Sequence, residues 1–252
     1  MPVTTREEGS VRIITLDWPE SRNALDAERL ARVIEAITDA DDGTAKCVVL
    51  TGNGAFCAGA NLGSVEEGGA QDSDRRQAVE GIAQSIVRVL LDCQIPTIAA
   101  IDGAAVGMGM DIALACDHRF IGPEGFLLQG WGRLGLIPGT GGELLLRRLN
   151  PTVLWRLLAD QPRLGPAEAE SLRLGSPGEP TAIDAAIELA TNLAGLPRTT
   201  LSVYVELFRA EVRAQLPAHL DLCARAQAEL LADPELGTRI AALRERGGRS
   251  PS

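Results

Sequence analysis

The sequence predicts an α/β fold with a parallel sheet in its first half. Two short apolar runs, CVVLTG ending at Gly52 and PTIAAIDG ending at Gly103, are typical of strands that are buried on both faces. Amphipathic stretches lie between such runs, and strands that alternate with helices pair in parallel. After Pro151 the pattern is almost wholly helical, which indicates a separate lobe or an oligomerisation element.

The individual elements follow in the order that this fold requires. Asp26 is a suitable N-cap for an amphipathic helix, and Gly43 lies just beyond its end. Residues 64–74 are polar and contain glycine, so we expect a mobile surface loop there. The helix at 201–232 has an apolar stripe that favours core packing over a subunit interface. The other expected strands are 11–18, 46–52, 96–103 and 118–122, and the other expected helices are 74–91 and 143–149.

Composition excludes several classes of protein. The 252 residues carry a net charge of −10, and a nucleic-acid-binding protein usually has a basic face instead. The five cysteines show no C-x-x-C spacing and the two histidines lie far apart, so we expect no metal site. The N-terminal stretch has no apolar core, and no run of about 18 apolar residues occurs. We therefore expect a reduced, cytoplasmic protein that binds neither nucleic acid nor membrane.

Two glycine-rich loops, residues 51–62 and 102–111, each follow a buried strand. Neither has the G-x-G-x-x-G or G-K-S/T pattern of the common nucleotide sites. Small residues let a backbone approach a ligand closely, and two converging loops can offer two N–H donors, as in an oxyanion hole. Taken singly, each loop is better explained by tight turns and close helix packing, and the case for a binding site comes from the pair.

Four blocks, in order, together resemble the crotonase (enoyl-CoA hydratase/isomerase) superfamily. WPESRNAL from Trp18 resembles the family's R-P-x-x-x-N-A-L segment, and VVLTGNGAFCAGANL from Val48 resembles a strand followed by F-x-A-G-A-D-L. IPTIAAIDGAAVGMGMDIALACDHRF from Ile95 resembles P-x-I-A-A-x-x-G-x-A-x-G-G-G-x-E-L-A-x-x-C-D. LGLIPGTGGELLLRRL from Leu134 resembles G-x-x-P-G-x-G-G-x-x-x-L-x-R. The resemblance is strong over roughly residues 11–150.

The resemblance implies a ββα spiral core over residues 1–195 and a helical C-terminal region over 196–252 that assembles a homotrimer or a dimer of trimers. It implies an acyl-coenzyme A thioester as substrate, no further cofactor, and a place in fatty acid metabolism. By motif position, the oxyanion-hole donors are the N–H groups of Ala58 and Met108. The residues placed near the substrate are Arg22, Asn23, Ala24, Leu25, Phe56, Cys57, Ala60, Asn61, Leu62, Gly107, Trp131, Pro138 and Gly139.

The sequence departs from the family in its acids. Asp111 stands where the family has its first glutamate, and it is one methylene shorter. A carboxylate there either transfers protons or complements the dipole of the following helix. The second glutamate's position holds Trp131, with Glu124 seven residues upstream and Glu143 in a helix start. Asn61 replaces the usual aspartate, and LRLGSPGEP stands where the family has a G-L-V strand.

Three hypotheses follow. The first is an enzyme of the hydratase/isomerase (lyase or isomerase) type in which Asp111 is the sole acid/base group and two N–H donors stabilise a thioester enolate. The second is a catalytically weak or inactive protein that binds acyl-CoA, because the second glutamate is missing. The third is a specialised hydrolase or decarboxylase of secondary metabolism, in which Gln129 and Trp131 shape the acyl pocket.

Overall fold

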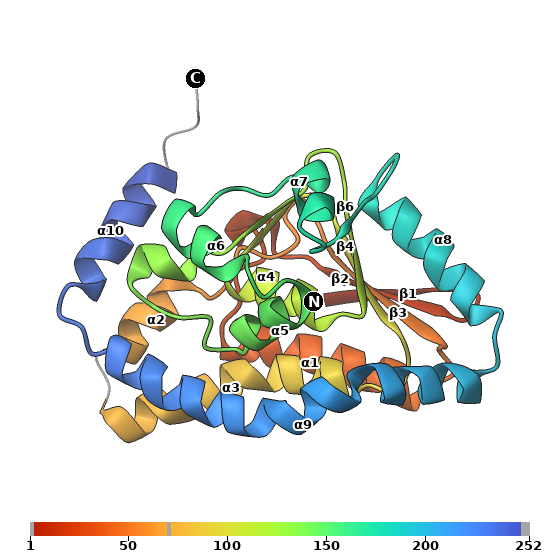
Figure 1. Ribbon diagram of the computed structural model, residues 1–252, viewed down its shortest axis with the longest axis horizontal. Helices are drawn as coiled ribbons and strands as arrows, with labels where there is room; N and C mark the ends of the chain where they lie inside the picture. Colours follow the sequence, from red (N-terminus) through yellow and green to blue (C-terminus); the bar gives the residue numbers. More distant parts are fainter. Residues whose placement is uncertain (1–2, 70–71, 248–252) are drawn as a thin grey trace.

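The computed structural model describes residues 3–69 and 72–247, and its centre is a six-stranded sheet (Figure 1). β1 is antiparallel to β2, and every other neighbouring pair is parallel. The strands of this sheet, in spatial order, are β1 (Val3–Glu8), β2 (Val11–Leu16), β3 (Cys47–Gly52), β4 (Thr97–Ile101), β6 (His118–Ile121) and β8 (Ser176–Pro177). A second, parallel sheet pairs β5 (Ala104–Val106) with β7 (Phe126–Leu128). The predicted α/β class with parallel pairing is confirmed.

The helices cover the sheet and then continue into the C-terminal region. They are η1 (Pro19–Ser21), α1 (Ala27–Asp42), α2 (Leu62–Gly69), α3 (Ser73–Asp92), α4 (Met108–Ala115), η2 (Trp131–Leu134), α5 (Gly142–Leu149), α6 (Leu154–Asp160), α7 (Pro166–Ser171), α8 (Ala182–Ala194), α9 (Arg198–Leu230) and α10 (Leu236–Gly247). The predicted N-cap of α1 is confirmed, because Asp26 Oδ1 accepts from the N–H of Arg29 at 2.9 Å.

Three local expectations are wrong. The segment expected as a loop at 64–74 falls mostly in α2 and the start of α3, apart from residues 70–71, which lie outside the described residues. β1 is absent from the predicted elements because its residues are mainly polar and exposed, as an edge strand allows. A short strand, β8, forms within LRLGSPGEP and pairs with β6, although the family's apolar residues are missing there.

Two hydrophobic layers enclose the sheet, as expected for strands buried on both faces. Ile14 and Leu16 of β2 belong to the larger core, which also contains residues of α1, α3, α4 and α5. Val11 and Ile13 of the same strand point the other way, into a smaller core closed by alanines of α8. Among the described helices, the alternation along β2 therefore places α8 on one face and the helices that build the candidate site on the other.

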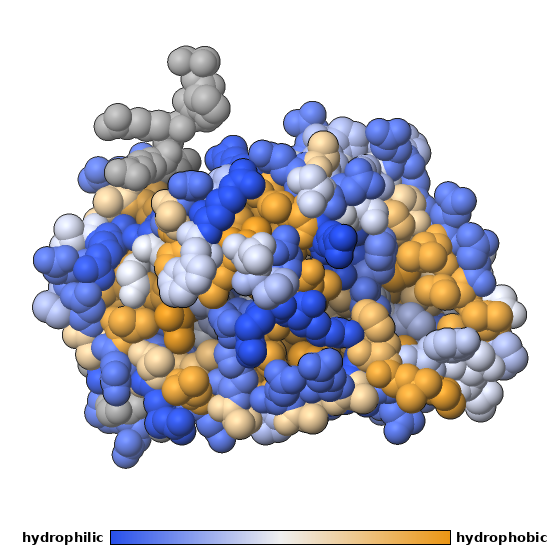
Figure 2. Space-filling model, in the orientation of Figure 1, coloured by the Kyte–Doolittle hydropathy of each residue, from blue (hydrophilic) through white to orange (hydrophobic). Residues whose placement is uncertain are grey.

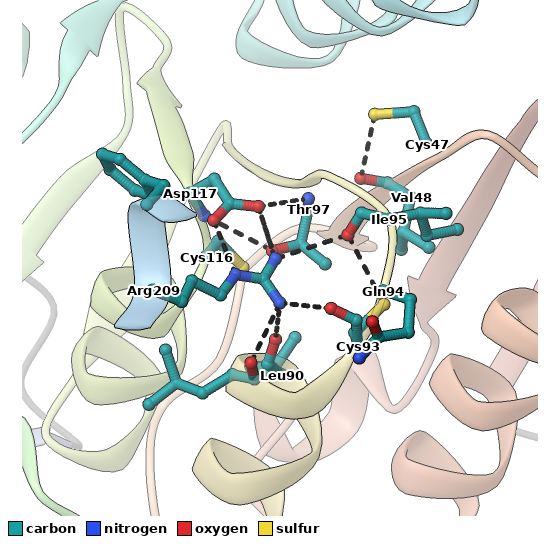
Figure 3. A network of polar contacts seen from close by, with 12 residues as sticks. Cys47, Val48, Leu90, Cys93, Gln94, Ile95, Thr97, Cys116, Asp117 and Arg209 are labelled. Atoms are coloured by element: carbon teal, nitrogen blue, oxygen red, sulfur yellow. Dashed lines mark hydrogen bonds and ion pairs between the residues drawn. The ribbon is translucent and has the colours of Figure 1, made fainter. Parts of the chain in front are cut away.

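A buried arginine, Arg209, holds α9 against the C-terminal end of α3 and against Asp117 (Figure 3). The guanidinium of Arg209 is fully buried and pairs with Asp117, its Nε lying 2.8 Å from Oδ1. Its Nη1 donates to the carbonyls of Leu90 and Cys93 at 2.6 Å, at the C-terminal end of α3. A cation there satisfies carbonyls that lack a helical partner and complements the helix dipole. Thus α9 is held along α3, beside the site.

The outer side of α9 exposes large apolar residues. Val203, Tyr204, Leu207 and Phe208 are all more than half exposed, and Figure 2 shows apolar surface on the side of the molecule where α8 and the start of α9 lie. The helix also buries Leu201, Val205 and Val212. Its apolar residues therefore serve core packing, as the sequence favours, but also leave an uncovered apolar face. No helix in the described part of the chain is long and apolar enough to span a membrane.

Candidate active site

The two glycine-rich loops converge, as their sequence predicts. Cys57 of the first loop forms a parallel bridge with Ala105 of the second, through hydrogen bonds from Cys57 N–H to the Ala104 carbonyl and from Val106 N–H to the Cys57 carbonyl, both 2.9 Å. Gly109 sits so close that a Cβ there would lie 2.8 Å from the Cβ of Cys57. Both loops follow the carboxyl ends of parallel strands, the edge at which open α/β sheets bind ligands.

The N–H of Ala58 is already engaged within the chain. It donates to the carbonyl of Arg22 at 2.9 Å, and Arg22 is held in the left-handed region with φ +53°. The assignment of Ala58 as an oxyanion-hole donor is therefore corrected, because a donor for a substrate oxygen must point into the binding site.

The N–H of Ala60, two residues further along, is not used by the bridge that this segment forms. In the parallel bridge between Leu25 and Ala60, Leu25 makes both hydrogen bonds: its N–H donates to Gly59 and its carbonyl accepts from Asn61, each at 2.8 Å. In such a bridge the N–H of Ala60 points away from Leu25. Sequence reasoning placed Ala60 only among the pocket-lining residues, because the motif does not show which N–H the bridge uses.

Met108 is the residue whose N–H the motif position assigns as the second donor. It is the first residue of α4, whose first-turn N–H groups have no acceptor within the helix. Gly107 before it has φ +55° and ψ −118°, a conformation that glycine tolerates and other residues do not. A Cβ on Gly59 would lie 3.5 Å from the Met108 nitrogen, so this N–H and the Ala60 segment are neighbours.

Asp111 lies in the first turn of α4, and its carboxylate is turned inward. Its Oδ2 accepts from Thr140 Oγ1 at 2.5 Å and from the indole Nε1 of Trp131 at 3.2 Å. The side chain is 1% exposed. Burial raises the pKa of Asp111 to about 7, although the hydrogen bonds from Thr140 and Trp131 act in the opposite direction. These contacts favour a role in proton transfer over that of a helix-dipole partner at the surface.

Trp131, which stands at the position of the family's second glutamate, forms a hydrogen bond with Asp111. Its indole N–H points at the carboxylate, and its ring lies against Gly107, where a Cβ would be 3.6 Å from the indole. The remaining acids near this motif lie elsewhere. Glu124 is in an exposed turn, and Glu143 forms an ion pair with Arg147 and lies with its Oε2 3.6 Å from His219 Nε2.

Glu80 of α3 is the residue that sequence reasoning missed. Its side chain is 8% exposed. Burial, and secondarily the charge of Asp111, raises the pKa of Glu80 to about 7. The signal was present in the sequence, because Glu80, Gln84, Val87 and Leu91 follow the i, i+4, i+7, i+11 spacing of one helix face. An acid on a face that is otherwise buried is a candidate functional residue.

Two cavities meet beside Ala60 and Met108. The smaller measures about 630 Å³ with its open mouth and is lined mainly by apolar residues, together with Asp26, Ser64, Glu80, Thr140 and Gln227. The larger measures about 1180 Å³ with its open mouth. Ala60, Val65, Met108 and Trp131 line both cavities, so they form the junction. Asp111 lines neither, because Thr140 and Trp131 stand between its carboxylate and the smaller cavity.

The charges of the two cavities differ in sign. The charged residues that line the larger one are Arg22, Arg133 and Arg163. Those of the smaller one are Asp26 and Glu80. An anionic ligand group is therefore favoured in the larger cavity and an uncharged one in the smaller.

The other predicted residues divide into lining and supporting groups. Leu25 lines the smaller cavity, and Arg22, Ala58, Leu62 and Gly107 line the larger. The residues that line neither are Asn23, Ala24, Phe56, Cys57, Asn61, Pro138 and Gly139. Among these, Asn23 is fully buried and joins the loops, its Nδ2 donating to the Ala55 carbonyl at 2.6 Å. Asn61 Oδ1 accepts from Gly63 N–H at 2.9 Å at the start of α2, so its side chain serves the loop itself.

The fold and this site define a protein of the crotonase fold. A family model described as enoyl-CoA hydratase/isomerase matches residues 6–247. A Mycobacterium tuberculosis protein named as a probable enoyl-CoA hydratase is 33% identical, with 97% of this chain and 98% of that protein covered. Carnitinyl-CoA dehydratase from Proteus mirabilis is also 33% identical, over 82% of this chain and 79% of its own.

Solved structures agree. An enoyl-CoA hydratase/isomerase from Mycobacterium paratuberculosis matches with a TM-score of 0.86 and 26% identity, covering 96% of this chain and 98% of the other. At 21% identity, where only the fold is shown, the decarboxylase domain of CurF from Lyngbya majuscula matches with a TM-score of 0.82, covering 96% of this chain and 99% of the other. The chain belongs to the enoyl-CoA hydratase/isomerase family.

Proposed function

We propose that this protein catalyses hydratase/isomerase chemistry on an acyl-coenzyme A thioester, by stabilising the thioester enolate. The observation that carries the proposal is the junction of the two cavities, which Ala60 and Met108 line, and behind which Thr140 and Trp131 hold the buried carboxyl of Asp111. Relatives named as enoyl-CoA hydratases support it.

The substrate orientation follows from the charges. The phosphates of coenzyme A would lie near Arg22, Arg133 and Arg163 in the larger cavity, and the acyl chain would enter the smaller, mainly apolar one. The thioester then falls at the junction. Two N–H groups fixed in place would stabilise charge that develops on its oxygen, and one such donor typically contributes about 2.7–4 kcal/mol to the transition state.

Asp111 is the proton donor and acceptor for C2 of the acyl group. Because Thr140 lines the cavity and its hydroxyl binds Asp111, a proton leaving C2 passes to Thr140 Oγ1 while the Thr140 proton moves to Asp111. The second transfer runs along the Thr140–Asp111 hydrogen bond, and the electron pair of the C2–H bond becomes the enolate.

The test measures enolate formation directly. Butyryl-CoA in D₂O would exchange its C2 hydrogens when the purified protein is added, which mass spectrometry detects, and Asp111→Asn would abolish this exchange. Crotonyl-CoA, longer 2-enoyl-CoAs and 3-enoyl-CoAs would serve as substrates for net reaction. The proposal is wrong if none of these thioesters changes and no deuterium enters butyryl-CoA.

A protein that binds acyl-CoA without turning it over is the second candidate. The observation that favours it is the position of Asp111, which lines neither cavity. Calorimetry with butyryl-CoA distinguishes the two, since heat of binding without any C2 exchange supports the binding protein.

We also propose that the chain assembles as the family resemblance implies, as a homotrimer or a dimer of trimers. The exposed apolar residues of α9, Val203, Tyr204, Leu207 and Phe208, support an interface on that helix. Light scattering of the purified protein would give its mass in solution, and a monomer at micromolar concentration would contradict the assembly.

A further inference from the structure

Glu80 occupies a place in the site that differs from that of Asp111. It lines the smaller cavity together with Met108, Trp131 and Thr140, so its carboxyl and the hole face the same space. Asp111 reaches that space only through Thr140. The side chain that meets an acyl group directly is therefore Glu80, contributed by α3.

The loop at residues 137–140 leaves space for the Glu80 carboxyl. Gly139 leaves the space in which Glu80 Oε1 lies, because a Cβ on Gly139 would be 2.9 Å from the Glu80 Cδ and closer still to Oε1. Gln84, one turn further along α3, donates its Nε2 to the Gly139 carbonyl at 3.1 Å. Gln227 Oε1 accepts from the Ile137 N–H at 3.2 Å, which holds the loop from the side of α9.

The next residue of the same loop binds the other acid. Thr140 donates to Asp111, so residues 139 and 140 contact the two carboxyls in succession. The two acids interact electrostatically, and Cys223 of α9 is a further titratable neighbour of both. The pKa of each carboxyl is raised to about 7, so near neutral pH one can be ionised while the other is protonated, and one can act as a base while the other acts as an acid.

Water addition to a 2-enoyl thioester needs both functions within one turnover. A base must take a proton from water as its oxygen attacks C3, and an acid must give a proton to C2. Exchange of a C2 hydrogen needs only one group. Trp131 stands in the place of the family's second glutamate. Asp111 then transfers the proton at C2, and a second group is needed to take a proton from the attacking water.

We propose that Glu80 is this second catalytic residue, the general base that activates water at C3. The inference rests on the proposed function and deepens it. The Glu80 carboxylate takes one proton of the water, the oxygen forms its bond to C3, and the C2–C3 π electrons pass to the thioester oxygen in the hole. Asp111 then gives a proton to C2 through Thr140. The proton on Glu80 returns to Asp111 or solvent, so the net change is addition of one water.

Glu80→Gln is the test variant, because it keeps the shape and removes the base. We expect hydration of crotonyl-CoA by this variant to fall by roughly 10²–10⁴-fold in kcat, the usual contribution of a general base, with KM within about threefold of wild type. Exchange of the C2 hydrogens of butyryl-CoA in D₂O should stay within about threefold. Glu80→Asp, which retains the carboxyl, should recover part of the hydration.

Glu188→Gln is the matched control, since it makes the same chemical change on the exposed side of α8. It should leave both reactions unchanged. Circular dichroism of every variant would show that it is folded.

The outcomes separate the two proposals. If wild type exchanges C2 hydrogens and Glu80→Gln still hydrates crotonyl-CoA within twofold of wild type, Glu80 is not the base. If the variant loses exchange and hydration equally, or if wild type exchanges without hydrating, the separate role of Glu80 is likewise refuted. If wild type does neither, the proposed function itself fails, and the role of Glu80 fails with it.

Discussion

Replacing Thr140 by valine would raise the pKa of Asp111 and thereby test the arrangement of the buried acid. The hydroxyl of Thr140 donates to Asp111 Oδ2 at 2.5 Å, and both side chains are 1% exposed. A hydrogen bond to a charged group contributes about 1.5–3 kcal/mol, and 1.36 kcal/mol corresponds to one pKa unit. Loss of the bond should therefore raise the pKa of Asp111 from about 7 to about 8–9.

The free energy of unfolding as a function of pH reports this shift. The folded-state pKa of Asp111 lies above its unfolded value, so its proton stabilises the fold fully below the unfolded pKa of 3.8, and this contribution is lost as pH rises through about 7. In Thr140→Val the loss should continue to about pH 8–9. Urea unfolding between pH 5 and 9.5 measures it. C2 exchange does not report the shift in Thr140→Val, because this variant lacks the hydroxyl that relays the proton between C2 and Asp111.

Thr140→Ser is the matched control, because it retains the hydroxyl and should keep the wild-type profile. Glu80 also titrates in this range, but its side chain is the same in all three proteins, so the differences between their profiles report Thr140. The reasoning is refuted if the valine and serine variants titrate within about 0.3 units of each other, well below the expected shift of about 1–2 units.

Three further predictions follow from other contacts. Arg209→Met should lower the free energy of unfolding by about 3–5 kcal/mol in urea denaturation, because it leaves Asp117 without its buried partner. Asp184→Ala, at an exposed position of α8, is the comparison. A smaller loss in Arg209→Met than in Asp184→Ala would contradict this. Gly142→Ala should displace Asp111, since its Cβ would collide with Oδ1, and should cost about 1–3 kcal/mol of stability together with C2 exchange. Gly237→Ala, which meets open space in α10, serves as its control and should be neutral or stabilising in the same assays. Arg163→Met should raise the Kd for butyryl-CoA in calorimetry and leave the exchange rate at saturation unchanged, and an unaltered Kd would remove Arg163 from the proposed phosphate region.

The sequence predicts the frame of the site well because that frame depends on local patterns. Apolar runs and glycine-rich loops are visible along the chain, and the predicted convergence of the two loops is confirmed by the Cys57–Ala105 bridge. The position of Asp111 after the glycines also places it on α4 directly. These inferences use neighbouring residues and the known geometry of parallel strands.

Contacts between distant segments could not be predicted in the same way. Ala58 and Ala60 are equally small and two residues apart, and only the partners Arg22 and Leu25 decide which N–H is engaged and which is directed away. Glu80 reaches the site through the packing of α3 against the 137–140 loop, 55 or more residues away. The outer face of α9 likewise resembles a core stripe until the fold shows which side is covered.

The replacement of a glutamate by Trp131 can then be understood through the charge that a closed site tolerates. Three ionised carboxyls in and behind the cavity junction would repel each other and would each be costly to bury. With Glu80 on α3 and Asp111 on α4, a third acid at position 131 would add such a charge. Tryptophan instead donates a hydrogen bond to Asp111 at 3.2 Å and fills the junction with an apolar ring. Trp131→Glu should therefore fail to restore the family's usual acid pair. It should lower the rate of C2 exchange below that of wild type, and adding Glu80→Gln should relieve this loss. Faster C2 exchange by Trp131→Glu alone than by wild type would contradict the shared role of Glu80.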